Sequence, residues 1–300
     1  MRLNKLLRLI LFFSVLMLAL PLQVNAEKKI TVYTVNYPLF YFAKRIGGEH
    51  VNVIFPAPPD VDPAFWTPDE STVRKYQQAD LILLNGANYE KWTKKVSLPM
   101  LRTVDTSRSF KATLIHIETS VTHSHGPGGD HSHGGTAFTT WLDFSQAALQ
   151  AEAILKSFVR KTPEHRQTFA DNFAALEADL LQLDERLKAI TAQKTMFPLV
   201  ASHPIYQYLA RRYYLDLKMM VWEPDADPGR AEWQKLKKQL KGFPALWMLW
   251  EGEPLAESAD RLGDMGISSI VFAPCFSKPK QGDFMSVMQQ NVQNMEKIFK

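Results

Sequence analysis

Residues 162–194 read TPEHRQTFADNFAALEADLLQLDERLKAITAQK, and the rest of the chain is organised around this stretch. It carries apolar residues at alternating steps of four and three, namely Phe169, Phe173, Leu176, Leu180, Leu183, Leu187 and Ile190. That spacing predicts one long α-helix with a single apolar stripe. Thr162 is expected to cap its start, with Pro163 in the first helical position. At about 1.5 Å per residue the helix would be on the order of 40 Å long, which predicts a spine joining two halves of the molecule.

Strand and helix signals alternate on both sides of this predicted spine. Such alternation predicts an α/β fold of two lobes, each with a mainly parallel sheet, joined by the one long helix. The alternative is a single large α/β domain that contains the same helix. The predicted strands are 30–35, 51–55 and 81–84 before the spine, and 197–201, 217–221, 245–249 and 270–272 after it.

The first 26 residues have the pattern of a secretory signal peptide, in which basic residues precede an apolar run at 9–20 and small residues end at Ala26. The alternative is an uncleaved N-terminal anchor. Cleavage would remove three of the 35 basic residues and none of the 31 acidic ones, which leaves a nearly neutral chain. Nucleic acid is therefore not an expected partner. The predicted organisation is a signal peptide (1–26), an N-terminal α/β lobe (27–143), a helical segment with the spine (144–195) and a C-terminal α/β lobe (196–300).

A segment at 121–135 interrupts the α/β pattern and contains four of the chain's eight histidines. Two His-Ser-His units, His123 with His125 and His131 with His133, flank a glycine-rich turn. Neutral imidazole is a common ligand of zinc and related cations. The segment has too few apolar residues to pack a core, so we expect a mobile surface loop that binds metal weakly. The alternative is a low-complexity insert without a role. The isolated histidines His50, His116 and His165 are predicted to lie on the surface.

The order of short motifs along the chain resembles that of a known family. The motifs are Tyr37-Pro38-Leu39, Ile46-Gly47-Gly48, Asp62-Pro63-x-x-Trp66-x-Pro68, Ala79-Asp80-Leu81, Trp141-Leu142-Asp143, His203, Tyr208 to Tyr213, Glu223-Pro224 and Glu251. Over almost the whole exported chain they resemble the zinc- and manganese-binding proteins of bacterial ABC importers, whose zinc-uptake members carry a His-rich loop at this place. The resemblance implies a periplasmic binding protein with zinc as its ligand and a membrane permease as its partner. A monomer is expected.

The resemblance also implies where the metal ligands should lie. Members of this family hold one metal ion between the lobes with four ligands, usually three histidines and an acid. The matching positions here are Ala64, Thr139, His203 and Ala273, so only His203 retains a ligand. Because alanine has no donor atom, these four positions alone cannot hold zinc tightly against water.

Neighbouring residues offer a replacement site. Asp62, Glu251 and Cys275 are on loops predicted to border the cleft, and a set of His203, Glu251 and Cys275 would be acceptable to zinc. The alternative readings are a structural role for the acids and a core position for the cysteine. The same loops carry many aromatic residues. These residues could line a cleft for a small organic ligand, or they could pack the interface between the lobes. The predicted lining residues are Phe65, Trp66, Thr139, Trp141, Trp222 and Trp250.

The sequence thus predicts the periplasmic solute-binding component of an ABC uptake system for zinc or another divalent metal. The His-rich loop would collect metal and pass it to the cleft around His203. The alternatives are a zinc chaperone or sequestering protein that uses only the loop, and a binder of a non-metal small ligand. An enzyme is not expected, because the chain has no nucleophile elbow, no His-Glu-x-x-His helix and no phosphate loop.

Overall fold

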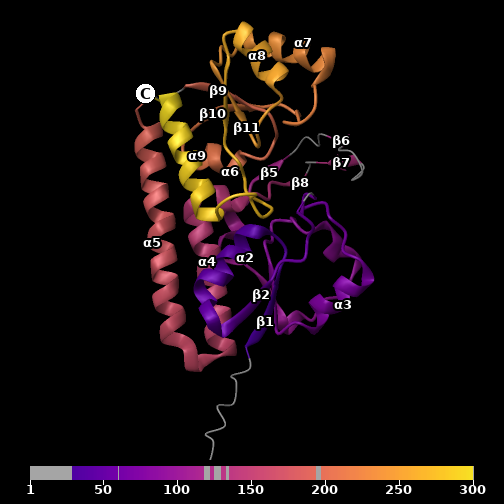
Figure 1. Cartoon of the computed structure of the whole chain (residues 1–300), viewed down its shortest axis with the longest axis vertical. Helices are drawn as coiled ribbons and strands as arrows, with labels where there is room; N and C mark the ends of the chain where they lie inside the picture. The colour runs from indigo at the N-terminus through magenta and orange to yellow at the C-terminus, as the bar shows by residue number, and fades with distance from the viewer. Residues whose placement is uncertain are drawn as a thin grey trace, which may run out of the picture.

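Two four-stranded parallel sheets lie towards opposite ends of the molecule, and one long helix runs beside both (Figure 1). The prediction of an α/β fold with two lobes and a spine helix is confirmed. The boundaries assigned to the lobes remain predictions. The computed structural model describes residues 29–59, 61–117, 122–124, 130–132, 135–193 and 197–299, with only the backbone in 122–124 and 130–132. The predicted signal peptide, His125, His133 and Lys194 lie outside the described residues.

The first sheet has the strand order β2-β1-β3-β4, and all neighbours are parallel. Its helices begin at side-chain caps: Asn36 accepts from the backbone of Leu39 at the start of α2 (Tyr37–Gly47), and Asp69 caps α3 (Glu70–Gln78). In Figure 1, α2 lies on the side of the sheet towards the long helix, and α3 lies on the other side. The strands are β1 (Ile30–Thr34), β2 (Val51–Ile54), β3 (Leu81–Leu84) and β4 (Thr103–Asp105).

The region of the His-rich segment contains short antiparallel strands, where the sequence predicted a loop. β5 (His116–Ile117) pairs with β8 (Gly135–Thr136), and beyond this pair β6 (Thr122–Ser124) pairs with β7 (Asp130–Ser132). In the β6–β7 ladder the backbones of His123 and His131 are directly opposite one another. The described parts therefore form two successive two-stranded antiparallel ladders. The β5–β8 ladder is the one next to the rest of the protein.

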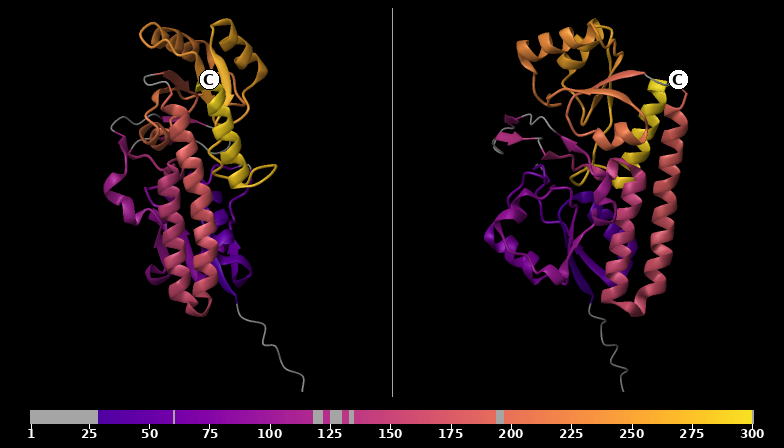
Figure 2. Two further views of the ribbon diagram at one scale, coloured as in Figure 1. Left: turned by 90° about the vertical axis from the view of Figure 1, so that its left-hand side faces the viewer. Right: turned by 180° about the vertical axis from the view of Figure 1, so that it is seen from behind.

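The spine is a helical hairpin of α4 (Phe144–Lys161) and α5 (Arg166–Thr191), joined by the 3₁₀ turn η7 (Pro163–His165). All seven residues of the predicted apolar stripe are buried. The predicted cap is wrong, because Thr162 belongs to the end of α4, where its hydroxyl donates to the carbonyl of Phe158. Figure 2 shows that α5 continues from the turn at the first lobe to the level of the second sheet.

The second sheet repeats the parallel plan with the order β10-β9-β11-β12. Its strands are β9 (Pro198–Ala201), β10 (Asp216–Met219), β11 (Trp247–Trp250) and β12 (Ser268–Val271). Its helices are α6 (Gln207–Arg212), α7 (Gly229–Leu240), α8 (Ala256–Asp264) and the C-terminal α9 (Phe284–Phe299), which packs on α5. The 3₁₀ segments used below are η1 (Gly48–His50), η2 (Lys91–Lys95), η3 (Met100–Arg102) and η6 (Thr140–Leu142).

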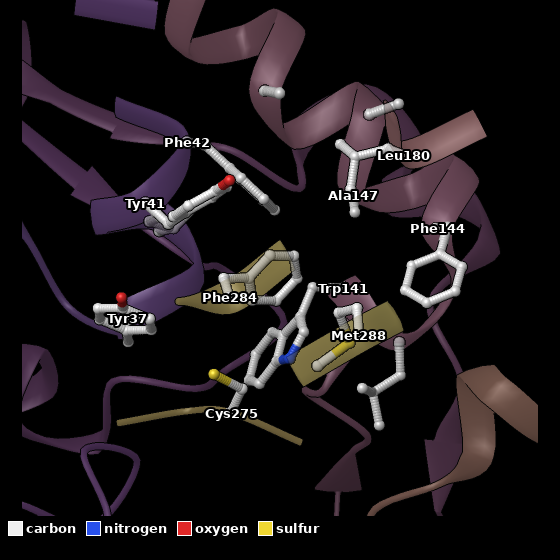
Figure 3. Packing of buried hydrophobic residues seen from close by; sticks show 14 of the residues in the cluster. Tyr37, Tyr41, Phe42, Trp141, Phe144, Ala147, Leu180, Cys275, Phe284 and Met288 are labelled. Atoms are coloured by element: carbon white, nitrogen blue, oxygen red, sulfur yellow. The ribbon is translucent and has the colours of Figure 1, made fainter. Parts of the chain in front are cut away.

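One large hydrophobic core runs through both lobes. It includes Val32 of the first sheet, Leu249 of the second sheet and Leu180 of α5. Figure 3 shows part of this core, where α2, α4, α5 and α9 meet. A smaller core lies around Trp222 and Trp233 within the C-terminal lobe. Among the helices that the structure describes, none combines the length and the apolar character needed to cross a bilayer.

Candidate metal site

Three loops meet at the carboxyl edge of the second sheet, because they follow three neighbouring parallel strands. His203 follows β9, Glu223 follows β10 and Glu251 follows β11. Backbone hydrogen bonds continue the strand pairing into these loops: Ser202 donates to Leu249 at 2.8 Å, and Trp222 donates to Ser202 at 2.7 Å. The three functional side chains are therefore held side by side by the sheet itself, as expected for ligand sites at the carboxyl ends of parallel strands.

The three side chains converge around the His203 imidazole. Its Nδ1 atom lies 3.2 Å from Oε1 of Glu223 and 3.8 Å from Oε1 of Glu251. One ligand atom from each residue can be chosen so that all three lie within 4.8 Å of one another. The His203 side chain is 5% exposed, whereas those of Glu223 and Glu251 are 24% and 13% exposed, so the group is sheltered but open on its acidic side.

The charges of this group attract a cation. Burial raises the pKa of Glu251 to about 7 although His203 opposes the shift, and Glu223 and Asp62 raise it further. Burial lowers the pKa of His203, but Glu251 and Glu223 outweigh that effect, so the pKa is raised overall. Several carboxylates thus lie close to one imidazole, and each favours the protonated form of its neighbours. A dication would replace those protons and balance the negative charge.

The N-terminal lobe adds one acid to this environment. Asp62 lies in the loop after β2, and one of its oxygens accepts from the backbone of Ala64 at 2.9 Å. Burial raises the pKa of Asp62 to about 6, while the backbone bond from Ala64 and the charge of His203 lower it and Glu223 raises it. Asp62 therefore belongs to the same electrostatic environment, although the group with converging ligand atoms does not include it.

The other three positions implied by the family resemblance are occupied by structural contacts. Ala64 is fully buried. The Thr139 hydroxyl donates to the carbonyl of Ile205, two residues after His203. The backbone N–H of Ala273 donates to the side-chain oxygen of Asn291 at 2.9 Å, and the side-chain amide of Asn291 donates to the carbonyl of Ala273 at 2.7 Å. Two of these positions have no side-chain donor and the Thr139 hydroxyl is bonded to Ile205, whereas Glu223 and Glu251 converge on His203.

Cys275 does not join the three residues, contrary to the expected His203–Glu251–Cys275 set. Its backbone has a φ of 58°, in the left-handed region, and its thiol lies in the hydrophobic core beside Trp141 and Phe284 (Figure 3). Burial, followed by the charge of Asp283, raises the pKa of Cys275 to about 12. A thiol that remains protonated is a poor metal ligand, and this one is core.

Most of the aromatic residues expected to line a cleft are core residues. Trp141, Trp222 and Trp250 are at most 1% exposed, because large apolar rings are stabilised by complete burial. The Trp141 indole donates to the carbonyl of Pro274 at 2.8 Å, and so connects the two lobes. Phe65 and Trp66 are partly buried against the main core. The described residues therefore offer no continuous aromatic wall for an organic ligand.

Glu223 is the candidate ligand that the sequence reasoning missed. A signal was available, since Glu223 follows a strand of the second sheet as His203 and Glu251 do. The isolated histidines lie apart from the group. His50 and His165 stack on each other with ring centroids 3.8 Å apart at the far end of the spine hairpin, and His116 lies in β5.

Comparison with known proteins places this architecture in a family. The family model described as "Zinc-uptake complex component A periplasmic" matches residues 32–298. A zinc-binding lipoprotein of Streptococcus pneumoniae, AdcA, is 26% identical over 289 residues, which cover 91% of this chain and 56% of that protein. The chain thus spans about half the length of the first curated relatives it matches.

A relative of similar length and a solved structure agree with this result. The high-affinity zinc uptake system protein ZnuA of Bacillus subtilis is 26% identical over 283 residues, which cover 88% of this chain and 86% of the relative. The crystal structure of the metal-dependent lipoprotein YcdH from Bacillus subtilis has a TM-score of 0.78 at 21% identity, and the match covers 91% of this chain and all of that one. Members of this family are components of an uptake complex and not enzymes, as the sequence predicts. The chain therefore belongs to the family of periplasmic A components of zinc-uptake complexes.

Proposed function

We propose that the exported chain is the solute-binding component of a zinc ABC uptake system and that His203, Glu223 and Glu251 hold the ion. The observation that carries this proposal is the convergence of one imidazole and two carboxylates at the ends of three neighbouring strands. Zinc accepts histidine nitrogen and glutamate oxygen, and three protein ligands leave a position for water or a further donor. The names of the relatives, which are zinc-binding and zinc-uptake proteins, support zinc as the ion.

We further propose that the His-rich segment collects zinc at low affinity and passes it to this site. The strand β8 leads from the hairpin to Thr139, whose hydroxyl bonds to Ile205 next to the His203 loop. A small pocket lies beside this contact, and it is lined by Ile117, residues 136–139, Pro204, Ile205 and Gln207. This short connection supports transfer between the two sites.

The proposed setting follows from the same family. The signal peptide at 1–26 would be cleaved, and the protein would act in the periplasm as a monomer that delivers zinc to a membrane permease. Because α5 has no glycine and runs past both sheets, we expect only small movements of the lobes when zinc binds.

Counting bound ions tests the proposal. The wild-type processed chain and a variant lacking residues 121–135 would be titrated with zinc by calorimetry. We expect the shortened variant to keep one tight ion, and the combination of this deletion with His203→Ala to keep none. Glu253→Gln is a matched control, since Glu253 is an exposed acid two residues from Glu251. Failure of the shortened variant to bind any zinc would refute the cleft site.

One observation favours a second candidate. Three of the four positions implied by the family, Ala64, Thr139 and Ala273, carry no metal ligand. A zinc chaperone or sequestering protein that uses only the His-rich segment would account for this. In that case the variant lacking residues 121–135 would lose nearly all its zinc, and His203→Ala alone would change nothing.

A further inference from the structure

Two adjacent apolar side chains stand almost free of the protein surface on η3. Met100 is 86% exposed and Leu101 is 97% exposed. Apolar residues scattered singly over a surface are ordinary, but a neighbouring pair with so little contact to its own protein is not explained by packing. The exposed pair is therefore a candidate contact for something outside the chain.

Hydrogen bonds fix the position of this pair on the molecule. Just before it, the carbonyl of Ser97 accepts from the side-chain amide of Gln77 near the end of α3, at 2.8 Å. Just after it, the Thr103 hydroxyl donates to Pro99 at 3.0 Å, and the Arg102 guanidinium contacts the carbonyl of Ala79 at 3.4 Å. Since η3 immediately precedes β4, the pair lies at the amino-terminal edge of the first sheet.

The segment that carries the pair is basic. Lys94, Lys95 and Arg102 are exposed on it, and no acid occurs between residues 91 and 104. Lys29, also exposed, precedes β1 at the same edge. Two acids among the described residues also lie on this edge: Glu49, which is exposed in η1, and Asp80, whose carboxylate accepts from the backbone of Thr31 at 2.8 Å. The processed chain as a whole is nearly neutral, whereas the segment from residue 91 to residue 104 is positively charged.

We propose that this amino-terminal edge is a contact surface for an anionic lipid bilayer. Met100 and Leu101 enter the interfacial layer, and Lys94, Lys95 and Arg102 lie against the phosphate groups. Apolar side chains flanked by cations are the chemistry of interfacial binding, in which burial of apolar area and attraction to anionic lipid add together.

The path of the chain supports a bilayer as the occupant. The apolar run at 9–20 ends ten residues before β1, which begins at this same edge. Ten extended residues span at most about 35 Å, so the edge would be close to the membrane for as long as the predicted signal peptide stays in the bilayer. The proposed metal site is at the carboxyl edges of the sheets, so contact through the amino-terminal edge leaves it uncovered. With so few side chains the binding should be weak and reversible.

Vesicle binding tests this proposal separately from zinc binding. The processed chain beginning at Glu27 would be sedimented with vesicles of mixed phosphatidylglycerol and phosphatidylcholine, or of phosphatidylcholine alone. We expect binding to the mixed vesicles only, and less of it as salt is added. Lys94→Glu with Lys95→Glu should lower the partition coefficient about 25-fold or more, at about fivefold for each cation. Met100→Ser with Leu101→Ser should lower it about tenfold through loss of apolar burial.

A control variant distinguishes binding through this edge from non-specific adsorption of exposed apolar side chains to vesicles. Leu246→Ser removes an apolar side chain that is 55% exposed in the C-terminal lobe, and it should leave vesicle binding unchanged. All variants should keep the wild-type Tm, since the altered side chains are exposed. No binding to the mixed vesicles, or equal binding by the wild type and both double variants, would overturn the proposal.

Discussion

The carboxyl edges of the two sheets have the same topology but use buried acids differently. In the first sheet, the Glu90 carboxylate accepts from the backbone of Asn85 and Gly86, and so holds the loop after β3 in shape. In the second sheet, Glu223 and Glu251 face the imidazole of His203. A carboxylate that accepts hydrogen bonds from backbone N–H groups stabilises the loop that donates them. Two carboxylates beside one imidazole form a negatively charged group that can bind a cation. The comparison favours the second sheet over the first as the place of the proposed metal site.

Among the changes considered, removal of the His203 imidazole should have the largest effect on zinc binding at the second sheet. In the variant lacking residues 121–135, we expect His203→Ala to weaken zinc binding by at least about 100-fold, since even loss of a group that only supports a ligand costs up to that much. Glu223→Gln should act in the same direction. Isothermal titration calorimetry would measure both, with Glu253→Gln as the unaffected control. Unchanged affinity in His203→Ala would show that the second sheet is not the metal-binding half.

Acid should weaken zinc binding at the second sheet almost as strongly. The pKa of Glu251 is about 7 and that of His203 is raised, and zinc binds their deprotonated forms. Affinity should therefore be highest above pH 7 and fall as the pH drops, by about 25-fold between pH 7.5 and 5.5 from the proton on Glu251 alone and by more once the proton on His203 is included. Titrations of the same shortened variant at these two pH values check this. A flat profile would contradict the assigned ligands.

The acid of the first sheet should affect stability and not binding. Burial raises the pKa of Glu90 to about 7 from 4.5, so its protonated form stabilises the folded protein. That stabilisation is complete below pH 4.5 and is lost as the pH rises through about 7. We expect Glu90→Gln to remove about 2 kcal/mol of the fall in the free energy of unfolding between pH 5 and 8. Urea unfolding of the zinc-free protein measures this.

Two results would complete the Glu90 comparison. Glu49→Gln, at an exposed glutamate, should leave the pH dependence of unfolding as it is in the wild type. The zinc affinity of Glu90→Gln at pH 7.5 should equal that of the wild type. A large loss of zinc binding in this variant would mean that the two edges are not functionally distinct.

Asp62 should show the smallest effect, because it acts on the site through its charge. We expect Asp62→Asn to weaken zinc binding about fivefold, which corresponds to about 1 kcal/mol for a charge near the ion. Calorimetry at pH 7.5 would detect it. A loss as large as that of His203→Ala would instead make Asp62 a direct ligand, and the site would then bridge both lobes.

Much of the fold could be predicted because it follows from local patterns. The apolar stripe of α5 has helical spacing, and all its members are buried. β3 is predicted and observed at the same residues, 81–84, since a short apolar run between polar turns is typical of a buried parallel strand. Among the α-helices and the strands of the two large sheets, β4 and α9 were not predicted. β4 has only three residues with no periodic signal, and α9 has two polar side chains on its buried face, Asn291 and Asn294.

The site was harder to predict, because it depends on backbone geometry between distant segments. Nothing local to Glu223 shows that the hydrogen bond from Trp222 to Ser202 brings it beside His203. For Cys275, the left-handed backbone directs the thiol into the core, although its position after a strand suggested the cleft. Trp222 and Trp250 follow predicted strands, so they were expected either to line a cleft or to pack at the lobe interface, and their size favours the interior. Position after a strand therefore identifies candidate residues, and side-chain chemistry decides which of them face the cleft.

The long helix α5 has a consequence for how the protein loses its structure. It packs on α2 of the first lobe and on the C-terminal α9, and its buried stripe belongs to a core that also contains residues of both sheets. Neither half can melt without exposing apolar surface of the other. Heating or urea should therefore give a single cooperative transition, and chains cut between α5 and β9 should regain native structure only when both fragments are present together.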